Sequence, residues 1–182
     1  MDTKLATAIS KYLSYILRHD PEEAGITLDA NGWTNVDKLI EHVRYRFPEL
    51  NKEMLEYVVA TNSKQRFAFN EGKTMIRASQ GHSVNVDLNY MAQQPPLVLF
   101  HGTSQDRVEA IMKEGLKKQE RHHVHLSENV TTALQVGRRH GQVCIVKVYS
   151  GKMHEDGYVF YLSANHVWLT DYVPPQYIED VY

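Results

Sequence analysis

Apolar residues recur every three or four positions in several stretches of the first half, which is the spacing of one buried face of an α-helix. The pattern predicts a helix over residues 5–17, a second from about Asp37, and a third after Asn51, whose side chain can cap a first turn. The apolar positions are Leu5, Ile9, Tyr12, Leu13, Ile16, Leu17, Leu39, Ile40, Val43, Met54, Leu55, Val58 and Val59. Each predicted helix therefore has one face for burial in a core.

Strand and turn signals predict two hairpins in the same half. Residues 26–28 can pair with residues 33–36 across a turn that contains Asn31-Gly32, a strong hairpin signal. Residues 66–70 and 74–77 are typical of a second hairpin. Helices followed by a hairpin have the order of a winged-helix unit, a layout often used to hold nucleic acid, although a fold does not define a function.

The pattern changes after a polar connector that contains Gly81 and Pro95-Pro96. The second half is rich in predicted strands, and its polar residues gather at strand ends. The predicted strands cover residues 97–100, 122–127, 143–148, 158–161 and 167–169, and the short helices end at Gly115 and cover residues 131–136. We therefore expect an α+β fold with lobes at residues 1–80 and 97–182 and a linker at residues 81–96.

Composition narrows the class of protein. Of the 182 residues, 42% are hydrophobic and 23% are charged, which fits an ordinary globular protein. The sequence shows no apolar run of membrane-spanning length and no signal-peptide pattern, so we expect a cytoplasmic protein without a membrane partner. The one cysteine, Cys144, excludes an internal disulfide and lies in an apolar run, so it is expected to be a buried structural thiol.

Charge is balanced along the chain, with a formal net charge of −2. Residues 1–90 carry 11 Lys and Arg against 12 Asp and Glu, and the remainder carries 9 against 10. Neither half is therefore a general polyanion binder. If nucleic acid or phosphate binds, it must bind at a focused cluster of arginines.

Two cationic clusters stand out. Arg18 and His19 lie side by side at the end of the first predicted helix, just before Pro21. They fit a helix terminus, where cations favour the negative end of the dipole, and they also fit an anion site with a guanidinium fork and a proton carrier. The second cluster, residues 137–141, is a compact turn with two arginines and a histidine between glycines.

Histidines in the second half open two further possibilities. The predicted strand at residues 97–100 runs into His101-Gly102-Thr103, where the glycine lets a ligand approach the main chain closely. His123 and His125 would share one face of a strand, as metal ligands can. No cysteine cluster or known histidine motif stands nearby to complete a coordination set, so we expect no metal site.

Several segments, taken in order, closely resemble the tRNA 2′-phosphotransferase family over nearly the whole chain. They are Ser10-Lys11-Tyr12-Leu13-Ser14 with Leu17-Arg18-His19, Ile76-Arg77-Ala78-Ser79-Gln80-Gly81-His82-Ser83, His101-Gly102-Thr103, His125-Leu126-Ser127, Val136-Gly137-Arg138-Arg139-His140-Gly141, and Ser163-Ala164-Asn165-His166-Val167-Trp168-Leu169-Thr170. The resemblance implies a winged-helix-like RNA lobe followed by an NAD-binding lobe with the ADP-ribosyltransferase fold. No single motif is decisive, but motifs in register along the chain are specific.

The resemblance also implies a reaction that removes an internal 2′-phosphate from RNA and consumes NAD. In the first step the 2′-phosphate attacks the nicotinamide ribose carbon and nicotinamide leaves. In the second step the ribose 2″-hydroxyl attacks the phosphate, which releases 2′-hydroxyl RNA and ADP-ribose 1″,2″-cyclic phosphate. The implied partners are therefore a tRNA-like RNA and NAD, and we expect a monomer that needs neither metal nor membrane.

Residue roles follow from the motif positions. The family's essential Arg-His-Arg-Arg tetrad falls on Arg18, His19, Arg66 and Arg139, the last chosen over Arg138 because it is the second residue after the motif glycine. The cofactor-binding residues implied are His101, Gly102 and Thr103 for the nicotinamide ribose and amide, with His125 and Ser127 lining the nicotinamide pocket. The late segment 165–168 offers no glutamate, which argues against a protein-modifying ADP-ribosyltransferase.

Three other functions compete with this one. NAD-dependent ADP-ribosylation of a terminal nucleic-acid phosphate uses the same kind of acceptor group, and the sequence does not separate the two. A non-catalytic RNA-binding module would need a broad basic face, which the charge balance disfavours. A metal-dependent phosphoesterase would use the histidines and would lose activity in chelator.

Overall fold

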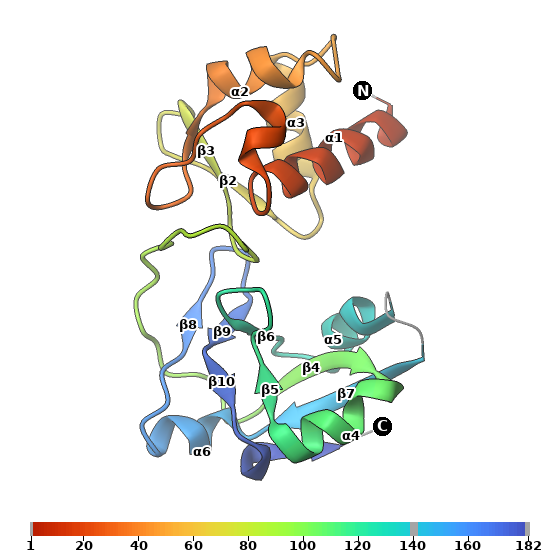
Figure 1. The fold of residues 1–182 in the computed structure, drawn as a ribbon, viewed down its shortest axis with the longest axis vertical. Helices are drawn as coiled ribbons and strands as arrows, with labels where there is room; N and C mark the ends of the chain where they lie inside the picture. The colour runs from red at the N-terminus through yellow and green to blue at the C-terminus, as the bar shows by residue number, and fades with distance from the viewer. Residues whose placement is uncertain (1, 139–141, 181–182) are drawn as a thin grey trace. The chain divides into compact units, whose positions relative to one another are not determined.

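The chain forms two compact units of mixed α/β structure with small antiparallel sheets, residues Met1–Asn89 and Tyr90–Tyr182 (Figure 1). The structure is a computed structural model and describes residues 2–138 and 142–180. The boundary between the units falls inside the expected connector at residues 81–96. We describe each unit separately.

Unit 1 combines helices with one small sheet (Figure 1, red to yellow-green). Its elements are α1 (Thr3–Ile16), η1 (Pro21–Ala24), β1 (Thr34–Asn35), α2 (Val36–Val43), α3 (Lys52–Thr61), β2 (Phe67–Phe69) and β3 (Met75–Ala78). The sheet is antiparallel and has the order β1-β3-β2. Asp2, Asn35 and Asn51 each accept a backbone N–H at a helix start, which explains why α1, α2 and α3 begin where they do.

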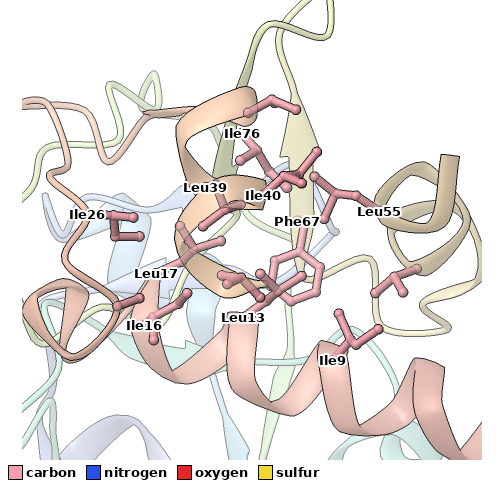
Figure 2. Packing of buried hydrophobic residues seen from close by; sticks show 14 of the residues in the cluster. Ile9, Leu13, Ile16, Leu17, Ile26, Leu39, Ile40, Leu55, Phe67 and Ile76 are labelled. Atoms are coloured by element: carbon pink, nitrogen blue, oxygen red, sulfur yellow. The ribbon is translucent and has the colours of Figure 1, made fainter. Parts of the chain in front are cut away.

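The helices of unit 1 share one core (Figure 2). Ile9, Leu13 and Ile16 of α1 are fully buried, and they lie on the side of the helix that faces Leu39 of α2 and Phe67 of β2. The apolar face predicted for the first helix is therefore confirmed. Burial of each such side chain contributes about 1.5–3 kcal/mol of hydrophobic free energy, so this stripe dominates the packing of α1.

The first predicted hairpin is wrong, whereas the second is confirmed as β2 and β3. Residues 26–28 form no strand, and Thr34 of β1 pairs with Ile76 of β3 instead. The turn is present, because the backbone N–H of Asp29 donates to the Trp33 carbonyl at 2.9 Å. The turn was therefore predicted correctly, but β1 pairs with β3, which is more distant in sequence, and not with residues 26–28.

Unit 2 is built around the long antiparallel pair β4 and β7 (Figure 1, green and light blue). Its elements are β4 (Leu99–Ser104), α4 (Gln105–Glu114), β5 (Leu116–Lys117), β6 (Val124–Leu126), α5 (Val130–Gly137), β7 (Val143–Val148), α6 (Ser150–Glu155), β8 (Tyr161–Leu162), β9 (Trp168–Thr170), β10 (Tyr172–Val173), η3 (Pro175–Tyr177) and β11 (Ile178–Asp180). The sheets have the orders β11-β7-β4, β6-β9-β8 and β10-β5.

Several predictions for unit 2 need correction. The strand expected over residues 158–161 is reduced to β8, because the Phe160 carbonyl accepts from Gln93 and the Val159 carbonyl accepts from the Thr170 hydroxyl. These hydrogen bonds satisfy the two backbone carbonyls without pairing to another strand. Helix α6 and strands β10 and β11 were not predicted, because each is too short to show a clear period. Cys144 is buried in β7, as expected.

Candidate functional site

Arg18 and His19 lie in a tight turn directly after α1. The backbone N–H groups of Arg18, His19 and Asp20 all donate to the Tyr15 carbonyl, at 3.3, 2.9 and 3.3 Å. The Tyr15 hydroxyl also donates to the Asp20 carboxylate at 2.8 Å, and this hydrogen bond raises the pKa of Tyr15. Because Pro21 cannot continue the helix, the chain turns here and places the side chains of Arg18 and His19 at one end of α1.

An irregular stretch after β3, which we term the 79–84 segment, contacts both arginine-bearing parts of unit 1. The N–H groups of Ser83 and Val84 donate to the Arg18 carbonyl at 2.9 and 3.3 Å, and Ser83 Oγ lies 2.9 Å from His19 Nδ1. At its other end, the Ser79 N–H donates to the Arg66 carbonyl at 2.8 Å. The segment therefore connects Arg18, His19 and Arg66, which are far apart in sequence.

Arg66 is held by a side chain from the end of α3. Asn62 Oδ1 accepts from the Arg66 guanidinium at 3.4 Å and from its backbone N–H at 3.3 Å. The Asn62 amide group in turn donates to Ser10 Oγ on α1 at 2.7 Å. A guanidinium whose plane is held by a neighbouring side chain has a geometry that suits the oxygens of a phosphate.

The imidazole of His101 in unit 2 is held at the junction of two sheets. The Phe100 and Ser127 backbones exchange two hydrogen bonds of 2.8 Å, which ties β4 to the chain after β6. The His101 Nδ1–H donates to the His125 carbonyl at 3.0 Å, because a carbonyl oxygen can only accept. The structure therefore brings His101, His125 and Ser127 together.

Helix α5 packs directly on β4 through two glycines. A Cβ atom on Gly102 would lie 1.9 Å from the Ala133 carbonyl oxygen, and one on Gly137 would lie 3.2 Å from the Thr103 nitrogen. The space beside Gly102 is thus filled by α5 backbone, which explains the missing side chain by packing. Thr103 is itself only 5% exposed. The same contact brings the start of the second cationic cluster, at Gly137, against the His101-Gly102-Thr103 strand.

Arg139, the fourth member of the expected tetrad, lies outside the described residues, as do His140 and Gly141. Arg138 is described and is the exposed C-cap of α5. The roles assigned to the tetrad and to the cofactor-binding residues stay predictions.

The two histidines considered as metal ligands have separate partners. The His123 ring packs edge-on against Tyr161 at 5.6 Å, and His125 Nδ1 accepts from the Arg121 guanidinium at 3.2 Å. Over residues 2–138 and 142–180, no group of three or more His, Cys, Asp or Glu side chains is arranged to hold a metal ion. In the same ranges no helix is long and apolar enough to cross a membrane.

Sequence reasoning assigned no role to Ser83, Asn62 or Arg121, although each contacts an expected site residue. Ser83 lies inside one of the motifs that carry the family resemblance, so a signal was present for it. Asn62 and Arg121 lie in polar loops next to expected elements, where sequence spacing alone does not reveal a contact.

Comparison with known proteins identifies the class of protein to which this chain belongs. Residues 4–172 match the family described as "RNA 2'-phosphotransferase, Tpt1 / KptA family". Because the match covers most of the chain, the protein is an enzyme of the transferase class. It belongs to the RNA 2′-phosphotransferase, Tpt1/KptA family, which confirms the family resemblance found in the sequence.

Named relatives are similar to this chain over nearly their full lengths. The chain is 54% identical over 179 residues to a probable RNA 2′-phosphotransferase of Flavobacterium johnsoniae, with 98% of each chain covered. It is 47% identical over 181 residues to a protein of the same name from Acaryochloris marina, covering 100% of this chain and 99% of the relative. A third, from Agrobacterium fabrum, is 48% identical over 174 residues and covers 96% and 94%.

Proposed function

We propose that this protein removes an internal 2′-phosphate from RNA in an NAD-dependent reaction. The observation that carries the proposal is family membership over residues 4–172, combined with the convergence of Arg18, His19 and Arg66 on one segment of unit 1. The substrates are an RNA that bears a 2′-phosphate, and NAD. The products are 2′-hydroxyl RNA, nicotinamide and ADP-ribose 1″,2″-cyclic phosphate.

Arg18 and Arg66 bind the phosphate in this proposal. A 2′-phosphomonoester carries nearly two negative charges, and the transfer step passes through a state with further charge on the oxygens. Guanidinium groups are always protonated and act as planar forks on such oxygens. Loss of one donor aimed at developing charge typically lowers a rate by about 10²-fold or more, so each arginine is expected to matter.

His19 carries the proton transfers of the second step. The ribose 2″-hydroxyl must lose a proton as it attacks the phosphate, and the departing RNA 2′-oxygen must gain one. Histidine is suited to both roles because its ordinary pKa lies near neutrality. The first step needs little base catalysis, because the phosphate is already an anionic nucleophile, and positioning dominates there.

The residues of unit 2 are chemically suited to hold NAD. His101, held through Nδ1, lies beside the backbone of His125, and the backbone of Ser127 pairs with the neighbouring Phe100 at the same junction of the sheets. Imidazole nitrogens, hydroxyls and backbone groups are donors and acceptors for ribose hydroxyls and for a carboxamide. Under this proposal unit 2 has the ADP-ribosyltransferase fold, and unit 1, with its helices and its β2–β3 hairpin, is a winged-helix lobe.

The test is an incubation of the purified protein with a short RNA that bears one internal 2′-phosphate, with and without NAD and without added metal. We expect NAD-dependent loss of the phosphate and formation of ADP-ribose cyclic phosphate. A matched RNA with only a terminal phosphate is the control for the acceptor. Reaction with the terminal phosphate alone would replace the proposal with terminal ADP-ribosylation, and reaction without NAD would contradict it altogether.

A further inference from the structure

The 79–84 segment places a serine hydroxyl beside the ring of His19, a residue 64 positions away in the chain. Ser83 Oγ lies 2.9 Å from His19 Nδ1, within hydrogen-bond distance. The Ser83 hydroxyl has been given no role above.

The position of this hydroxyl is set by backbone contacts on both sides. The N–H groups of Ser83 and Val84 bind the Arg18 carbonyl, so Ser83 and His19 are attached to the same turn. The preceding residue, His82, is only 2% exposed, and Ser79 at the start of the segment is 1% exposed and donates to the Gln65 carbonyl at 3.1 Å. The segment is therefore anchored by buried residues.

This anchoring matters because Ser83 and His19 are both exposed. A hydrogen bond between two exposed side chains contributes little in water, since either group can exchange its partner for solvent. When the backbone already fixes the two Cα positions, less conformational entropy is lost in forming the bond. The geometry thus favours a persistent contact over a transient one.

We propose that Ser83 is a positioning residue for His19: its hydroxyl accepts a hydrogen bond from Nδ1–H and thereby reserves Nε2 for proton transfer. The inference rests on the proposed function. A neutral imidazole has one N–H donor and one lone pair, so protonation at Nδ1 leaves the lone pair on Nε2. Ser83 in this way selects both the orientation and the tautomer of the ring.

In the second step, His19 Nε2 then both accepts and returns the proton. Nε2 takes the proton of the ribose 2″-hydroxyl while that oxygen forms its bond to phosphorus. The bond between phosphorus and the RNA 2′-oxygen breaks, and Nε2–H returns the proton to that oxygen. Nδ1 stays bonded to Ser83 throughout, so the ring does not rotate between the two transfers.

The kinetic test compares Ser83→Ala and Ser83→Thr with wild type in single-turnover reactions that resolve the two steps. In Ser83→Ala we expect the second step to slow by about tenfold, a part of the roughly 10²–10⁴-fold typical of acid–base catalysis. The first step should be unchanged, so ADP-ribosylated RNA accumulates, and Ser83→Thr should restore the second step. Thr7→Ala is the matched control, because it removes an exposed hydroxyl of α1 that binds only the Thr3 carbonyl among the described contacts.

A second test needs no RNA. Nitrogen-15 NMR of the imidazole rings, recorded where histidines are neutral, distinguishes Nδ1–H from Nε2–H. We expect His19 to be protonated at Nδ1 in wild type and at Nε2 in Ser83→Ala. An unchanged tautomer, or a Ser83→Ala protein with normal second-step rate, would overturn the role of Ser83. A wild-type protein that does not react at all contradicts the proposed function, so the two failures are distinguishable.

Discussion

Gly102→Ala tests the closest contact in unit 2, that of α5 on β4. The added Cβ would lie 1.9 Å from the Ala133 carbonyl oxygen and 3.0 Å from the Gly137 nitrogen. An ordinary carbon–oxygen contact is about 3.3 Å, so α5 would have to retreat by about 1.4 Å. Because both neighbours are backbone atoms in a helix, no side-chain rotation can relieve the overlap.

Overpacking of this kind costs typically about 1–3 kcal/mol, and a backbone clash belongs at the upper end. A loss of about 3 kcal/mol corresponds to a fall in Tm of about 6–12 °C for a chain of this size. The measurement is thermal unfolding followed by circular dichroism, with hydrogen exchange of α5 to locate the loss.

Gly72→Ala is the matched control, because a Cβ there would meet only the Thr74 side chain, at 3.9 Å or more. Its Tm should stay within about 1 °C of wild type, as is usual for surface substitutions. If Gly102→Ala unfolds at the same temperature as the Gly72→Ala control, then α5 does not pack on bare β4 backbone, and the packing explanation for Gly102 is refuted.

Three further predictions address the site and the stability of the fold. Asn62→Ala should leave the free energy of unfolding within about 1 kcal/mol of wild type but lower turnover about tenfold, because the Arg66 guanidinium loses a partner that orients it. Normal turnover in Asn62→Ala would contradict this. Arg66→Ala should abolish most turnover while calorimetry shows NAD binding retained, and full activity would remove Arg66 from the site. The Tyr177 hydroxyl donates to Asp156 at 2.7 Å and lowers the pKa of that carboxyl, so the bond stabilises the fold above the ordinary aspartate pKa of about 4 and the stabilisation is lost as pH falls below it. The difference in Tm between wild type and Tyr177→Phe should therefore be largest near neutral pH and shrink below about pH 4, and a difference independent of pH would contradict the assignment.

Local signals in the sequence were sufficient to predict the helices of unit 1 and the family. The apolar period of residues 5–17 and the cap at Asn51 each involve residues that are close in sequence. Such local signals can be recognised without knowledge of the tertiary structure. The same holds for the β2–β3 hairpin, whose strands are joined by a short turn. The catalytic candidates were found by motif order, since each motif is itself a short local pattern.

Contacts between distant segments required the folded chain. Residues 26–28 were predicted to form a strand that pairs with β1, but β1 pairs with β3 instead. The choice among strand partners depends on the packing of the whole unit. The sequence did not reveal that α5 packs against Gly102, since a missing side chain does not show which segment lies beside it. Ser83 and His19 meet across 64 positions only because backbone bonds carry the 79–84 segment onto the turn after α1. Local periodicity determines elements, whereas the partners of a strand, a glycine or a histidine depend on contacts that form only in three dimensions.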